Sequence, residues 1–232
     1  MPKGKLPPCP DPELYILVKT KEGSFWRRKR GTVKKASLNK TFSDNNQAFR
    51  ILMPAAARMV KKLYAYTRQL DMGRITARIA GKWLKPFIDT GAISFAALNK
   101  MELQRDHPLE HLCNANYIIT ANGGVHRIYI DLVSGQVIAQ NTLVTDYYFE
   151  AVLLYGDPTT DGGLVTRDRT SELYHFGAET PAGCALEIPC APAGEPWLLF
   201  LKVSCLEENE MAAHYKNYAM KVVGVGVGER KS

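Results

Sequence analysis

The feature that most constrains the fold is a series of short apolar segments, separated by turn residues, in the second half of the chain. Residues 127–132 alternate apolar and polar side chains, which is the period of a strand with one buried face. Turn signals flank them at residues 122–124 (Asn-Gly-Gly) and 134–135 (Ser-Gly). The other strand candidates are 116–121, 136–140, 149–155, 172–176, 185–188, 197–205 and 218–225. About eight short strands without a βαβ pattern predict an antiparallel β-sandwich over 111–232, and disfavour a parallel nucleotide-binding sheet.

The residues before this series have the period of helices. From Met53 onward, apolar side chains recur at i, i+3, i+4 and i+7, and the helix is predicted to begin at Ser43 or Asp44, which are good N-caps. Pro54 is expected to kink or restart it. A second helix is predicted over 75–85, ended by Pro86, and a shorter one over 95–104. The basic residues opposite the apolar face of the first helix favour a solvated surface over a nucleic-acid contact: Arg58, Lys61, Lys62 and Arg68.

A small β-hairpin is predicted near the N-terminus. Its strands, 14–19 and 24–29, are rich in β-branched and aromatic residues and are joined by a turn that contains Gly23. An isolated hairpin is only marginally stable in water. Phe25 and Trp26 are therefore expected to need a covering surface, on this chain or on another, and they are the candidate residues for assembly or stacking.

The charge of the chain is divided between its two halves, although its formal net charge is only +7. Up to Glu110 there are 22 Lys and Arg against 9 Asp and Glu, and after it there are 8 against 14. The densest basic part, 19–62, has 13 basic and 2 acidic residues. Three interpretations stay open: a contact for a polyanion, a solvated arm, or self-association of the basic half with the acidic half of another copy. The candidate contacts for nucleic acid or another polyanion are Arg27, Arg28, Lys29, Arg30, Lys34, Lys35 and Lys40.

No motif predicts catalysis or a metal site. His107, His111 and Cys113 have a spacing that a metal could use, but Pro108 disfavours a helical His107, and a linker is the better account. Cys184 or Cys190 could pair with His175 or His214 as nucleophile and base, yet neither cysteine lies in a recognisable catalytic motif. Residues 157–163 lack the acidic spacing of a calcium loop, and the glycines of 224–228 indicate a flexible tail, since no helix can follow them.

The five cysteines and the N-terminus indicate a reducing compartment. The count is odd, no export signal is visible among the prolines of the first ten residues, and no stretch is long and apolar enough to span a membrane. The cysteines are therefore expected to be free thiols, with Cys205 in the core, although pairing of Cys184 with Cys190 or Cys205 stays open. A cytoplasmic location, or an assembly made in the cytoplasm, is expected.

The order of these parts resembles an uncharacterised bacterial family. The residues that carry the resemblance are the basic run 27–31, the Gln-Ala-Phe-Arg segment 47–50, and the apolar segments 151–155, 197–204 and 218–222. Members of that family have a basic N-terminal segment, a helix and an immunoglobulin-like β-sandwich. The resemblance implies this fold and no established activity, and the helical part 71–110 is longer here.

The sequence thus predicts an α+β protein with a basic arm and hairpin (1–43), a helical region (44–110) and an antiparallel, immunoglobulin-like β-sandwich (111–232). The hydrophobic content of 46% and charged content of 23% exclude a disordered chain. We expect a structural or assembly protein, not an enzyme, that forms homo-oligomers through its arm and needs no cofactor. The alternative is sequence-independent binding of nucleic acid by the basic arm.

Overall fold

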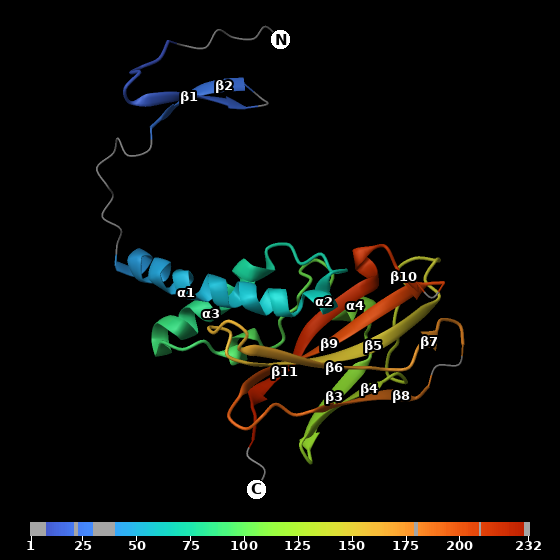
Figure 1. Cartoon of the computed structure of the whole chain (residues 1–232). Coiled ribbons are helices and arrows are strands. Elements are labelled where there is room, and N and C mark those ends of the chain that lie inside the picture. The colour runs from blue at the N-terminus through green and yellow to red at the C-terminus, as the bar shows by residue number, and fades with distance from the viewer. Residues whose placement is uncertain (1–7, 21–22, 30–39, 179–180, 209, 230–232) are drawn as a thin grey trace. The chain divides into compact units, whose positions relative to one another are not determined.

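A computed structural model describes residues 8–20, 23–29, 40–178, 181–208 and 210–229, with only the backbone of 40–42 (Figure 1). The chain divides into two compact units, Met1–Ser43 and Asp44–Ser232. Among the described residues the fold is α+β and the strands pair antiparallel, which confirms the α+β part of the predicted fold class.

The first unit contains a two-stranded antiparallel hairpin. Strand β1 (Tyr15–Thr20) pairs with β2 (Gly23–Arg28), with Tyr15 opposite Arg28 and Thr20 opposite Gly23. Each strand is displaced by one residue from its predicted range, which is within the ordinary uncertainty of an element boundary.

The second unit contains the two remaining sheets and the helices. Its helices are α1 (Lys40–Lys62), which begins just before the unit boundary, α2 (Tyr64–Thr67), α3 (Ile75–Thr90) and α4 (Leu109–Leu112), with 3-10 turns at Phe95–Leu98 and Tyr215–Asn217. Helix α1 starts earlier than predicted and continues through Pro54 as one element. Helix α3 continues through Pro86, where the sequence predicted its end, and stops at Gly91, whose φ of 74° is left-handed. A proline removes one helical hydrogen bond, and the buried Ile79 and Trp83 hold α3 against the core.

The predicted helix over 95–104 is wrong beyond Leu98. Lys100 has a φ of 59°, which ends the helical path. The segment then runs beside β11 (Tyr218–Val227): the amide of Leu103 donates to the carbonyl of Met220, and the amide of Val222 donates to that of Met101. Long-range hydrogen bonds therefore determine the path of 99–104.

The main sheet is built on two long strands, β5 (Asp146–Gly156) and β9 (Pro196–Glu207), which pair with each other. Strands β10 (Glu210–Met211) and β11 pair with the other edge of β9. Strands β6 (Leu164–Thr170) and β7 (Tyr174–His175) pair with the other edge of β5. The predicted strand 136–140 is wrong, since Val137 makes only an isolated bridge to Cys113, whereas β6 was not predicted.

The smaller sheet has three strands in the order β3-β4-β8. They are β3 (Asn116–Asn122), β4 (Val125–Asp131) and β8 (Gly183–Pro189). The alternation that predicted β4 is seen directly, because its even-numbered residues His126, Ile128 and Ile130 are buried.

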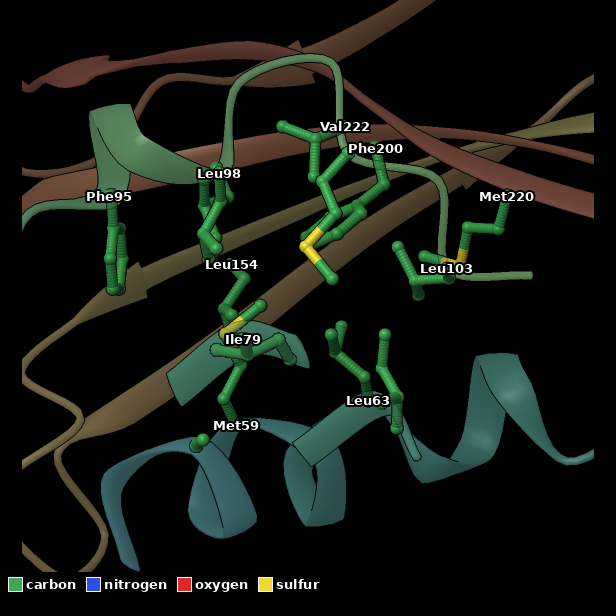
Figure 2. Close-up of a cluster of buried hydrophobic side chains, with 14 of the residues drawn as sticks. Met59, Leu63, Ile79, Phe95, Leu98, Leu103, Leu154, Phe200, Met220 and Val222 are labelled. Carbon is green, nitrogen blue, oxygen red and sulfur yellow. The ribbon is translucent and has the colours of Figure 1, made fainter. Parts of the chain in front are cut away.

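The second unit has three layers, with the main sheet in the middle (Figure 1). Successive residues of β9 point to opposite faces: Leu198 and Phe200 enter a core shared with the helices, whereas Leu199 and Leu201 enter a core shared with the smaller sheet. Figure 2 shows Met59 of α1 and Ile79 of α3 facing Phe200 and Val222 of the sheet. The helices and the main sheet thus share one core.

Candidate functional site

The predicted contact residues that the structure describes lie on one strand. Phe25, Trp26, Arg27 and Arg28 belong to β2, and Lys29 follows it. The side-chain ammonium of Lys29 donates to the carbonyl of Pro12 over 3.1 Å. Arg30, Lys34 and Lys35 lie outside the described residues, as does the side chain of Lys40, the first residue of α1.

The hairpin places its aromatic residues on opposite faces. Phe25 lies opposite Val18 on one face, and Trp26 lies opposite Leu17 on the other. Because side chains alternate along a strand, Arg27 shares the face of Phe25, and Arg28 shares that of Trp26. Each face therefore combines an aromatic ring, an aliphatic side chain and a guanidinium. Ile16, Leu17 and Phe25 are 38%, 39% and 50% exposed.

The basic residues of α1 line an open cleft of about 600 Å³ in the second unit. Arg58, Lys61 and Lys62 form one side, and residues 160–162 of the loop between β5 and β6 form the other. The guanidinium of Arg58 is 3.8 Å from the Asp161 carboxylate. Lys61 and Lys62 also occupy the last turn of α1, where cations favourably meet the helix dipole. The helix dipole is therefore sufficient to explain why Lys61 and Lys62 lie in this turn.

A second cleft, of about 560 Å³, was not found from the sequence. We call it the arginine cleft, because Arg74, Arg78 and Arg105 line it. Its other lining residues are Asp71, Met72, Gly73, Ala77, Gln104, Asp106 and Tyr215. Arg74 and Arg78 are one turn apart at the start of α3, a spacing visible in the sequence, but Arg105 joins them only through the path of 99–104.

A small void near the helices is a packing defect. It measures about 10 Å³ between α1, α3 and the main sheet, and its lining is apolar apart from Thr67. A water needs a comparable volume and two or more polar partners. This void is therefore no ligand site.

The cysteine and histidine candidates for catalysis occupy separate environments. Cys184 is buried, and burial raises the pKa of its thiol. His175 pairs with the Asp146 carboxylate, with which it is in register between β7 and β5. His214 stacks on Tyr215, and its Nδ1 accepts from the amide of Lys216 over 3.2 Å. Cys190 is half-buried after β8, where its carbonyl accepts from Arg167.

The remaining motifs also have local explanations. His107 and His111 make an edge contact with ring centroids 5.7 Å apart. Within the described part of the chain, no group of three or more His, Cys, Asp or Glu side chains could hold a metal. In the 157–163 loop, the Asp157 carboxylate accepts from the amide of Thr159 over 2.8 Å. The expected flexible tail at 224–228 is instead mostly strand β11, where Gly224 and Gly226 leave room for the ring of Trp197.

Two further findings bear on the kind of protein this is. No helix of the described residues combines the length and apolarity that crossing a membrane requires. No model of a known protein family and no curated protein sequence matches the chain.

Proposed function

We propose that the protein is a non-enzymatic structural or assembly protein that forms homo-oligomers through its N-terminal arm. The observation that carries this proposal is the hairpin β1–β2, which exposes Ile16, Leu17 and Phe25, whereas the described part of the second unit buries most of its large apolar side chains. The location that fits this role is the cytoplasm, or an assembly made there.

The energetics of the hairpin support a partner. A two-stranded hairpin is marginally stable in water, and covering a large apolar side chain contributes about 1.5–3 kcal/mol when it goes from exposed to fully buried. Ile16 and Phe25, which share one face of the hairpin, would each gain part of that amount on docking. The smallest stable, specific interfaces bury about 1,200 Å² of surface in total.

Charge supports a second copy as the partner. The strand that carries Phe25 ends in Arg27 and Arg28, and the residues after Glu110 have an excess of acidic side chains. Opposite potentials steer association and fix its orientation. We propose that the acceptor is the acidic second half of another copy, whose two facing sheets form an immunoglobulin-like sandwich that serves as the building block.

The environment of the thiols supports a non-enzymatic role. A nucleophilic cysteine needs a lowered pKa, because the thiolate is the reactive form. Burial has the opposite effect here: it raises the pKa of Cys113 and Cys184, and that of Cys205 to about 12. These thiols remain protonated at neutral pH and act as small apolar core residues.

The test is the mass of the protein in solution, measured by light scattering after size-exclusion chromatography. The variant Ile16→Ser/Phe25→Ser, and a chain that lacks residues 1–43, are expected to be folded monomers. The control is Ile88→Ser on the exposed face of α3. This large apolar side chain lies outside both the arm and the proposed acceptor, so the variant should leave the oligomer intact. An oligomer unchanged by both arm variants would refute the proposal.

The second candidate function is sequence-independent binding of nucleic acid, which the pairing of Phe25 with Arg27 on one hairpin face favours. Aromatic rings stack on single-stranded bases while cations meet phosphates. Fluorescence anisotropy with random DNA and RNA tests it: log affinity should fall with log salt by about 0.7–0.9 per phosphate contact. The variant Arg27→Ser/Arg28→Ser should then reduce that slope by about two contacts. Absence of binding at about 50 mM salt would leave the arm as a protein–protein element.

A further inference from the structure

The arginine cleft brings three guanidinium groups to one concave surface of the second unit. Arg74 and Arg78 come from the start of α3, and Arg105 comes from the segment that follows the bridge to β11. Among the residues that the structure describes, no carboxylate lies within salt-bridge distance of any of the three. These cations are therefore available to a ligand.

The floor of the cleft is held in place by a buried amide. Gln104 is almost fully buried, and its side-chain oxygen accepts from the amide of Asp71 over 3.1 Å. Its side-chain nitrogen donates to the carbonyls of Tyr215 and Tyr218 over 3.2 and 3.3 Å. One side chain thus links three segments of the cleft. Because these segments are already held in place, binding of a ligand would cost little conformational entropy.

Arg78 is fixed in the same way. Asp106 and Glu102 act on its charge electrostatically, but among the described residues no carboxylate lies within salt-bridge distance of its guanidinium. Its two terminal nitrogens donate to the carbonyls of Leu103 and Glu102 over 3.0 and 2.6 Å. These bonds orient the guanidinium and leave other N–H groups unused, since arginine has five. The pKa of Arg78 is lowered by burial and next by the positive charge of Arg105. A bound anion would relieve this repulsion between two cations.

The start of α3 adds to the same field. Arg74 occupies the N-cap position without a capping side-chain hydrogen bond, and no acidic residue lies in the first turn. The amides of a helix N-terminus carry a partial positive charge. Two carboxylates also line the cleft. Asp71 accepts from the amide of Gly73 over 3.2 Å, which stabilises its own loop. Asp106 follows Arg105 directly in the sequence, and its carboxylate makes no salt bridge with a described arginine.

We infer that the arginine cleft binds a phosphorylated small molecule through its phosphoryl group. Guanidinium groups present planar pairs of N–H donors that match two phosphate oxygens at once, which a lysine cannot do. A volume of about 560 Å³ is in the range of clefts that hold ligands of nucleotide size. Tyr215, whose ring stacks on His214, provides an aromatic surface for the organic part of such a ligand.

The test uses the full-length protein and isothermal titration calorimetry at about 50 mM salt, with inorganic pyrophosphate and ADP as probes. Saturable binding of either probe is expected. Arg74→Gln and Arg105→Gln should each weaken it at least about tenfold, because each removes a charge-assisted contact. Lys85→Gln, which removes an exposed cation of α3 outside the cleft, is the matched control and should leave the affinity within about twofold.

The two probes distinguish the source of the phosphoryl group. Tighter binding of ADP that falls with Tyr215→Ala supports a nucleotide-like ligand, whereas equal binding of both probes supports recognition of the phosphates alone. Absence of saturable binding up to about 10 mM probe would overturn the inference, as would binding that Arg74→Gln and Arg105→Gln leave unchanged. Binding of random RNA or DNA without binding of either probe would also overturn it. None of these outcomes depends on the oligomeric state.

Discussion

The buried ion pair of the main sheet allows the sharpest test of how this fold is stabilised. Glu150 of β5 and Lys202 of β9 are register partners, and the Lys202 ammonium donates to the Glu150 carboxylate over 3.2 Å. Their side chains are 12% and 4% exposed. The pair lies on the face of the sheet that carries Phe200, toward the helices.

Breaking this pair should be costly, because it leaves one charge buried without its partner. Removing one member of such a pair typically costs about 3–5 kcal/mol. Glu150→Leu is expected near the upper value, since the lysine is almost completely buried, and Lys202→Met near the lower one. For a unit of this size, each 1 kcal/mol lowers the melting temperature by about 2–4 °C, so the losses are about 6–20 °C.

The double variant separates the pair from the packing around it. Replacing both partners by apolar residues of similar volume is often neutral or stabilising, so Glu150→Leu/Lys202→Met should lie within about 1–2 kcal/mol of the wild type. The measurement is urea unfolding followed by tryptophan fluorescence and circular dichroism. A double variant as unstable as the sum of the two single variants would refute this reasoning.

The matched control is a second cross-strand pair. Arg127 of β4 and Glu187 of β8 are register partners as well, but their side chains are 60% and 52% exposed. An exposed ion pair contributes at most about 1 kcal/mol. Arg127→Met should therefore change the unfolding free energy little, and a loss as large as that of Glu150→Leu would show that burial is not the cause.

Three further predictions concern other parts of the second unit. Trp83→Ala should lower the unfolding free energy by about 3–5 kcal/mol, because this side chain is fully buried. Ile88→Ala, on the exposed face of α3, should change the unfolding free energy by less than about 1 kcal/mol. Denaturant melts compare the two variants. Gly81→Ala should stabilise α3 by up to about 1 kcal/mol, because a Cβ at this position meets open space. Gly226→Ala should destabilise the protein, because its Cβ would lie 2.6 Å from the ring of Trp197. Thermal melts of both variants check the two opposite signs. Burial lowers the pKa of His126, whose ring nitrogens have no hydrogen-bond partner among the described residues, so the unfolded chain takes up its proton first on acidification. The unfolding free energy should thus fall as the pH drops through about 6.5, and His126→Leu should reduce this loss in melts at two pH values.

Much of the fold is determined by short-range patterns in the chain. Alternation of apolar and polar residues identifies β4, and continuous apolar runs identify β5 and β9, since a strand buried on both faces shows no alternation. The 3.6-residue period identifies the apolar face of α1. These patterns depend only on which neighbouring side chains share a face, and that relation holds wherever the element finally packs.

Other features depend on partners that are distant in the sequence, and they were decided only when the chain folded. The sequence predicts a helix over residues 99–104, but hydrogen bonds to β11 hold them in a non-helical path beside that strand. Strand β6 has a mostly polar, half-exposed pattern and exists because β5 offers it an edge. Helix α3 continues through Pro86 because Trp83, one turn earlier, is buried in the core. The arginine cleft arises in the same way, since the path of 99–104 brings Arg105 to the same cleft as Arg74 and Arg78. A local sequence pattern cannot predict this proximity, because it depends on how distant segments pack.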